Sequence, residues 1–142
     1  MDAPTVERVS ASDLDAASVI ALYESVGWSV YTADPSTLLA GLAGSATVAV
    51  ARSGGALVGL ARVVSDGATI CYLQDVLVHP EHRLHGLGRR LVESVLEPHA
   101  TVRQKVLLTD DEPGQRRFYE SLGYSETRDF GEGTLRAFVR FD

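Results

Sequence analysis

The residues best suited to chemistry form a basic turn with two closely spaced glycines, between His79 and Arg90. An apolar run with strand character ends at Pro80, and a helix-like pattern continues past Gly88. The first N–H groups of a helix have no partner within it and lie at the positive end of its dipole, so such a turn presents donors to an anion. Glycine lets the backbone approach a phosphate where a Cβ would intrude. The turn is therefore predicted to bind phosphate.

The spacing of this turn distinguishes between kinds of phosphate-binding motif. A dinucleotide-binding G-x-G-x-x-G motif needs a third glycine where Leu91 stands, and a Walker loop needs a Gly-Lys-Ser/Thr sequence that the chain lacks. The spacing Arg-x-x-Gly-x-Gly from Arg83 to Gly88, directly after a strand, instead resembles the coenzyme A signature of the GNAT acetyltransferase superfamily. An ordinary tight connection between a strand and a helix is the plain alternative.

A second segment, Gln115–Tyr124, resembles the other hallmark of this superfamily, a short helix that ends in Phe-Tyr-x-x-x-Gly-Phe/Tyr. Phe118, Tyr119 and Leu122 lie at positions i, i+1 and i+4, and Gly123 follows at a helix C′ position. A small amphipathic helix packed on a sheet would show the same pattern. The two motifs occur in the family's order with a strand-like segment between them, so the chain is identified as a member of the GNAT superfamily.

The resemblance implies acetyl-CoA as co-substrate, without a metal, and contacts made mostly by the backbone. The N–H of Val76 or Leu77 is expected to polarise the acetyl oxygen, and Val78 to hydrogen-bond the pantetheine arm. The pyrophosphate is expected on the turn, whose residues are Arg83, Leu84, His85, Gly86, Leu87, Gly88 and Arg89.

Two residues are candidates for proton transfer. Tyr119 matches the tyrosine that many members use as general acid, and a tyrosine stays protonated at neutral pH because its ordinary pKa is near 10. Asp75 interrupts an apolar strand, which favours a carboxylate base, although a structural bond to an arginine or to backbone would also explain it, and many members use ordered water instead. Glu112 stands where many members carry asparagine, so that family contact is not transferred.

The acceptor is expected near the connection between the first two helices. Trp28 and Tyr31 would wall an apolar or cationic amine pocket, since aromatic faces attract cations; capping the core is their plain alternative. The net charge of −6 mildly favours a cationic small-molecule amine and argues against nucleic acid as partner.

Composition limits the remaining possibilities. With 142 residues, 45% of them hydrophobic, the chain is expected to form a single N-acetyltransferase domain over residues 1–142. The sequence shows neither a signal-peptide pattern nor a membrane-length apolar run, so a cytoplasmic protein with no membrane partner is expected. His79, His82 and His85 have metal-like spacing, but Pro80 and the arginines among them disfavour a metal site.

Strand and helix patterns predict an α/β (α+β layered) domain with a central mixed β-sheet flanked by helices, in the order β-α-α-β-β-β-α-β-α-β-β. This order matches the GNAT fold, which implies that the strands at 69–78 and 105–109 splay apart. The expected strands are 5–9, 46–52, 56–64, 69–78, 105–109, 125–130 and 135–141; the expected helices begin at Ser12 or Asp13, at Pro35, at His85 and at Gly114. The strand at 135–141 is also a candidate for pairing in a homodimer.

The sequence thus predicts an enzyme that moves an acetyl group from acetyl-CoA to a primary amine of a small molecule by direct attack in a ternary complex. A coenzyme A-binding sensor without turnover and a misread nucleotide-binding domain are the alternatives.

Overall fold

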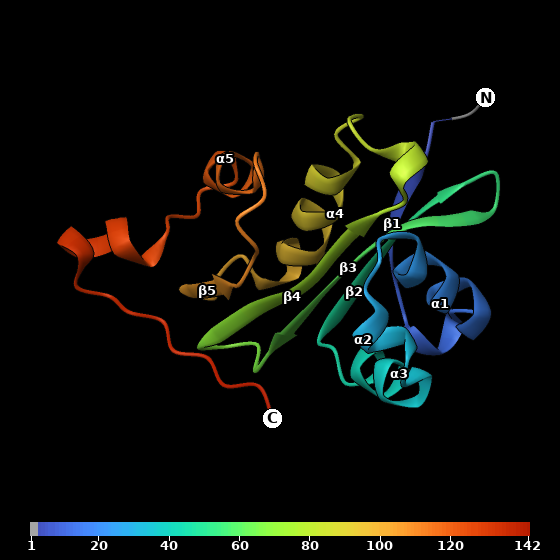
Figure 1. Ribbon diagram of the computed structural model, residues 1–142, viewed down its shortest axis with the longest axis horizontal. Coiled ribbons are helices and arrows are strands. Elements are labelled where there is room, and N and C mark those ends of the chain that lie inside the picture. The colour runs from blue at the N-terminus through green and yellow to red at the C-terminus, as the bar shows by residue number, and fades with distance from the viewer. Residues whose placement is uncertain (1–2) are drawn as a thin grey trace. The chain divides into compact units, whose positions relative to one another are not determined.

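The computed structural model describes residues 3–142, which fall into two compact units with a boundary after Leu108. The first unit contains all five strands: β1 (Thr5–Val9), β2 (Thr47–Ser53), β3 (Ala56–Ser65), β4 (Ile70–Val78) and β5 (Gln104–Leu107). Its helices are α1 (Ala16–Ser25), α2 (Ser29–Thr32), α3 (Pro35–Ala43) and α4 (Leu87–Leu96), with 3-10 turns at Ala11–Asp13, Pro80–His82 and Glu97–His99. The second unit contains α5 (Gln115–Ser121) and a 3-10 segment, Thr127–Gly133 (Figure 1).

The five strands form one mixed sheet in the order β1-β2-β3-β4-β5. Neighbouring strands from β1 to β4 are antiparallel, whereas β5 runs parallel to β4. The predicted meander of three strands and the predicted mixed sheet are therefore confirmed.

Helices cover both faces of this sheet, and alternation along the strands decides which side chain meets which helix. Val48, Val50 and Leu60 belong to the core cluster that includes buried residues of α1 and α3. On the opposite face, a Cβ added to Gly59 would lie 2.8 Å from Cδ1 of Leu91 on α4, so a larger residue here would require the Leu91 side chain to shift.

The first helix starts later than the sequence predicts. Ser12 and Asp13 were the expected caps, but Asp13 ends a 3-10 turn, and the carboxylate of Asp15 accepts the Ser18 N–H at 3.0 Å instead. The second predicted start is confirmed, because Asp34 caps α3 by accepting the Thr37 N–H at 3.3 Å, with Pro35 in the first turn.

The two C-terminal strands predicted at 125–130 and 135–141 are wrong. Residues Thr127–Gly133 form a 3-10 segment in which Gly131, Glu132 and Gly133 have φ of 54°, 60° and 78°, values that interrupt an extended chain. Residues 134–142 contain no strand, and Phe138 and Phe141 are 93% and 88% exposed. The observed order therefore has no strand after α5, and the pairing of 135–141 in a homodimer stays a prediction.

Candidate active site

The edge of β4 is where the predicted acyl-CoA contacts lie. Parallel pairing with β5 runs only from Ile70–Gln104 to Leu73–Leu107, while β4 continues to Val78. Within the described residues, β4 therefore has no strand partner on this side between Gln74 and Val78. Unpaired strand edges present N–H and C=O groups to an extended ligand, as the prediction for Val76, Leu77 and Val78 requires.

The predicted phosphate turn directly follows this strand. Gly86 has φ of 73° and is the N-cap of α4, so the left-handed conformation that glycine permits turns the chain into the helix. The first N–H bond inside the helix runs from Arg90 to the Gly86 carbonyl at 3.2 Å, which leaves the N–H groups of Leu87 and Gly88 ahead of the helical bonds. A Cβ on Gly86 would meet no atom within 4 Å, so the space beside the turn is open. The strand, turn and helix are thus arranged as predicted.

Leu84 holds an unusual backbone conformation in the middle of this turn. Its φ is 67°, although leucine rarely adopts the left-handed region, and its side chain is fully exposed. Strain of this kind costs roughly 1–3 kcal/mol and concentrates at ligand-binding turns. Neighbouring charges are anchored: Arg83 donates from Nε to the Val78 carbonyl at 3.4 Å, and Arg89 forms an ion pair with Glu93 at 2.8 Å.

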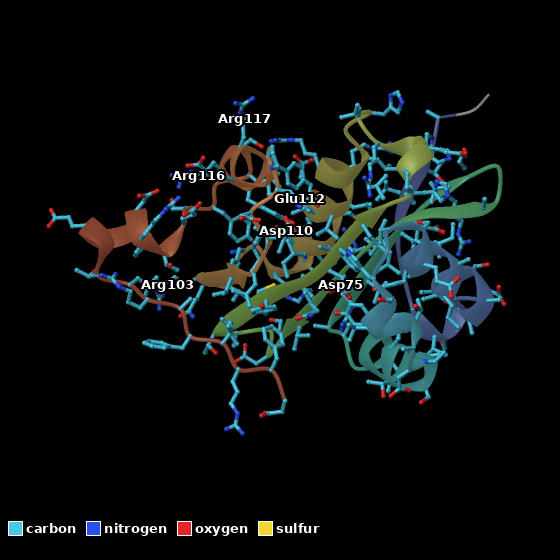
Figure 2. The ribbon with its side chains drawn as sticks, in the orientation of Figure 1. Asp75, Arg103, Asp110, Glu112, Arg116 and Arg117 are labelled. Carbon is cyan, nitrogen blue, oxygen red and sulfur yellow. The ribbon has the colours of Figure 1, made fainter. Side chains whose placement is uncertain are left out.

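Asp75, which is labelled in Figure 2, lies at the centre of a buried polar network. The sequence suggested an arginine as its structural partner but not which one, and it did not suggest the two tyrosines. Its Oδ2 accepts hydrogen bonds from Nε of Arg62 at 2.6 Å and from the hydroxyl of Tyr23 at 3.0 Å, and its Oδ1 accepts from the hydroxyl of Tyr31 at 2.9 Å. The side chains of Asp75 and Arg62 are only 3% and 8% exposed. Both carboxylate oxygens are therefore engaged, which favours the structural alternative for Asp75 over a base.

Arg62 extends this network to the next helix. Its NH1 donates to the Gly41 carbonyl at 3.3 Å and to Oγ of Ser45 at 3.4 Å, while its charge pairs with Asp75. The carboxylate raises the pKa of Arg62 against the opposing effect of burial, so the guanidinium stays charged. The sequence does indicate a buried ion pair here, because an arginine inside the apolar run 56–64 needs a buried partner.

The two predicted acceptor residues lie together in an aromatic cluster with Tyr23. The rings of Trp28 and Tyr31 are 6.1 Å apart, and Tyr23 meets them edge-on at 5.8 and 5.2 Å. Tyr31 is partly buried, and its hydroxyl accepts a hydrogen bond from Nε2 of the exposed Gln74 at 3.0 Å. Burial and the Asp75 charge raise the pKa of Tyr31, so its hydroxyl keeps its proton.

Tyr119 belongs to the second unit, on α5. Its ring contacts the rings of Phe118 and Tyr124, with centroids 4.9 and 6.0 Å away. The helix ends as predicted, with Gly123 in the left-handed region at φ of 94°. Burial and the nearby Asp110 raise the pKa of Tyr119 above its ordinary value, which keeps the hydroxyl protonated and fit to donate.

Glu112, the departure from the family pattern, precedes α5. Its N–H donates to the Asp110 carboxylate at 3.1 Å, and its carbonyl accepts the Gln115 N–H at 3.2 Å. These bonds use the backbone of Glu112 and assign no task to its side chain.

Two of the three histidines at the turn, His79 and His82, have local contacts. Nδ1 of His79 accepts the Glu81 N–H at 3.2 Å, and its ring lies 6.0 Å from that of His82. Between residues 3 and 142, no group of three or more His, Cys, Asp or Glu side chains is placed to hold a metal ion. In the same range, no helix is long and apolar enough to cross a membrane.

Comparisons with known proteins identify the class that this fold and turn define. Residues 44–126 match the family model of the acetyltransferase (GNAT) domain, so the chain belongs to the GNAT acetyltransferase family, as predicted. This match includes β4, the glycine turn after it and α5. The GNAT fold is confirmed by an acetyltransferase of the GNAT family from Streptococcus pneumoniae, with a TM-score of 0.84, 24% identity, and coverage of 99% of this chain and 98% of that one.

Two further relatives carry more specific names. A histone acetyltransferase of Glycine max, TAP1, is 32% identical over 139 residues, which cover 84% of this chain and 57% of the relative. The structure of the aminoglycoside N-acetyltransferase AAC(6')-Iy in complex with CoA has a TM-score of 0.67 to this chain at 15% sequence identity. The similarity covers 99% of this chain and 94% of that one. The chain spans about half the length of the curated relatives that it matches, 42% of one and 57% of the other.

Proposed function

We propose that this protein is an N-acetyltransferase that moves the acetyl group of acetyl-CoA to a primary amine of a small molecule. The observation that carries the proposal is the end of β4, which among the described residues has no strand partner on the β5 side and leads directly into a glycine turn at the start of α4. This arrangement offers backbone donors and acceptors to an extended amide chain and, next to them, a seat for its phosphates. Membership of the GNAT family supports the same interpretation.

The residues present fit coenzyme A. The pantetheine arm would lie along Val76, Leu77 and Val78, where β4 has no partner strand among the described residues. The pyrophosphate would occupy the open space beside Gly86, close to the N–H groups that begin α4. Arg83 and Arg89 at the turn add positive charge near this seat.

The transfer itself needs a nucleophile, a polarised carbonyl and two proton movements. The neutral amine nitrogen attacks the thioester carbonyl carbon, a backbone N–H of Val76 or Leu77 stabilises the oxyanion, and the carbon–sulfur bond then breaks. The hydroxyl of Tyr119 donates its proton to the departing thiolate, and water takes the proton that the amine loses. Asp75 is not assigned the base role, because Arg62 and two tyrosines occupy its oxygens.

The acceptor would bind beside Trp28 and Tyr31, whose aromatic faces favour a cation. The acidic net charge of −6 also attracts cationic amines. The relatives are named for different acceptors, histone in one and aminoglycoside in the other, so the choice of a small molecule rests on this cluster and on the charge.

An amine screen with acetyl-CoA tests the proposal. Thiol release would be followed with polyamines, amino sugars, lysine derivatives and a histone-tail peptide, and products checked by mass spectrometry for one added acetyl group. Amine-dependent thiol release with an acetylated small molecule is the expected result. Acetylation of the peptide alone would overturn the small-molecule acceptor, and tight acetyl-CoA binding without transfer to any amine would favour a coenzyme A sensor. Displacement of acetyl-CoA by ATP at similar concentration would favour a nucleotide-binding domain.

A further inference from the structure

Little apolar packing holds α5, the helix that carries the proposed acid Tyr119. This helix spans only the seven residues Gln115–Ser121, and so short a helix is not stable without further contacts. Among the described residues of α5 none is fully buried, so a core does not fix the helix. The orientation of the Tyr119 hydroxyl therefore depends on partly exposed contacts within the second unit.

Arg116, labelled in Figure 2, supplies contacts of this kind from α5. It forms ion pairs with three carboxylates, those of Glu120, Glu126 and Asp129. Its Nε and Nη2 donate to the two oxygens of Glu120 at 3.2 and 3.4 Å. Its Nη1 lies 3.0 Å from Oε1 of Glu126, and Nη2 also donates to Oδ2 of Asp129. All three guanidinium nitrogens are engaged, and these four residues are called the Arg116 network below.

The form of this network distinguishes it from an ordinary surface ion pair. An isolated exposed pair contributes little to stability, whereas a bidentate contact or several charges in one network contribute more. A planar guanidinium can serve three carboxylates at once, because its five N–H donors point in fixed directions. Without this cation, the carboxylates gathered around it would repel one another.

The network encloses the contact between two tyrosines. Glu126 and Asp129 follow Tyr124 in the chain, while Arg116 precedes Tyr119 on α5. The Tyr124 N–H donates to the Tyr119 carbonyl at 3.1 Å, and the two rings meet edge-on with centroids 6.0 Å apart. Because the network ties the chain on both sides of this contact to one guanidinium, it holds the Tyr124 ring against the Tyr119 ring.

We propose that Arg116 is a positioning residue, which holds Tyr124 against Tyr119 and so fixes the direction in which the Tyr119 hydroxyl donates its proton. Arg116 acts through Tyr119 and transfers no proton itself. This inference rests on the proposed acetyl transfer, in which Tyr119 is the acid.

The test compares Arg116→Met with the matched variant Arg128→Met, since Arg128 pairs with the same Glu126 and its side chain is 72% exposed. We expect Arg116→Met to lower kcat about 10- to 100-fold with the amine found in the screen, because a misplacement of about 1 Å can cost about 100-fold. Calorimetric affinity for acetyl-CoA should stay that of wild type, and Arg128→Met should change neither value. An unchanged kcat in Arg116→Met, or an equal loss in the control, would overturn the inference.

Variants that alter the network in other ways check the same point. Arg116→Lys keeps the positive charge but not the planar fork, so it should recover only part of the lost kcat. The double variant Glu126→Gln/Asp129→Asn removes the charges on the other side and should lower kcat as Arg116→Met does. Full activity of this double variant would contradict the positioning role.

A Tyr119→Phe background shows whether Arg116 acts through the tyrosine. The effects of residues that act as a unit are not additive. Arg116→Met should therefore lower kcat no further once the Tyr119 hydroxyl is absent. A further loss of the same size as in wild type would show that Arg116 supports the fold in general, and it would contradict the inference.

NMR of the protein with 13C-labelled tyrosine separates this inference from the proposed function, because it needs no turnover. The chain has five tyrosines, and the Tyr119 signal is assigned by its loss in Tyr119→Phe. Arg116→Met should shift the signals of Tyr119 and Tyr124 and leave those of the first unit unchanged. These shifts in a protein that acetylates no amine would support the role of Arg116 in placing Tyr119 and refute the acetyl transfer. An unshifted Tyr119 signal would overturn the inference whether or not the wild type is active.

Discussion

Breaking the Arg62–Asp75 pair should cost far more stability than removing it altogether. In Asp75→Leu, the Arg62 guanidinium, with its side chain 8% exposed, loses its carboxylate and stays buried. An uncompensated buried charge destabilises a protein by about 3–5 kcal/mol. In Arg62→Met, Asp75 keeps two hydroxyl donors, so we expect a smaller loss of about 2–3 kcal/mol, the cost of leaving a buried polar group without its partner. The double variant has no buried charge but leaves the buried Tyr23 hydroxyl without its partner, so we expect a loss of about 1–3 kcal/mol. The two single losses together are about 5–8 kcal/mol, which makes the coupling energy about 2–7 kcal/mol.

The assay is urea unfolding followed by far-UV circular dichroism for the four proteins of this cycle. With m-values of about 1–3 kcal/mol per molar urea, each single substitution should lower the midpoint by roughly 1 M or more while the slope is retained. The Arg8–Glu97 pair is a matched control, because its N–O distance is also 2.6 Å but its side chains are 44% and 70% exposed. Surface pairs couple by only about 0.2–1 kcal/mol. A coupling energy for Arg62 and Asp75 no larger than that of the control would refute the reasoning.

Three further predictions concern the proposed acid and the glycine turn. Tyr119→Phe should lower kcat about 100-fold, within the range for loss of a general acid, with acetyl-CoA affinity unchanged by calorimetry; an unchanged kcat would remove the acid role. Tyr119 can donate only in its protonated form, and its pKa is raised above the ordinary tyrosine value of about 10. Ionisation of Tyr119 should therefore cause no fall in the wild-type kcat below pH about 10, which a pH profile of kcat would check. Leu84→Gly should relieve left-handed strain and raise the free energy of unfolding by about 1 kcal/mol, measured by urea unfolding; a lower stability would show that the turn is not strained at this residue.

Local signals in the sequence predicted the conformation of the glycine turn well. Glycine at Gly86 and at Gly123 takes the left-handed conformation that each motif requires, and Asp34 with Pro35 starts α3. These features depend on a few neighbouring residues, which is why their spacing was sufficient. The strands β2, β3 and β4 likewise follow from local pattern, because each is an apolar run bounded by turn residues, and in β4 buried and more exposed residues alternate.

Features set by tertiary contacts were predicted less well. The partner of Asp75 comes from β3, and two more partners come from α1 and α2, so no spacing along the chain indicates them. The C-terminal segment has an apolar pattern suited to a strand, but the left-handed residues Gly131–Gly133 precede it and its aromatic side chains lie exposed. A strand needs a neighbour to bond to, and pattern alone does not supply one.

Calorimetric titration with acetyl-CoA tests the central claim most directly. The variants are Gly86→Glu, which puts a carboxylate into the phosphate seat, and Gly67→Glu as a control, since Gly67 has a similar φ of 77° and equal open space in the turn between β3 and β4. We expect micromolar binding by wild type and by Gly67→Glu, and none by a folded Gly86→Glu. Failure of the folded wild-type protein to bind acetyl-CoA, or equal binding by Gly86→Glu, would contradict the assignment of this turn as the coenzyme A site.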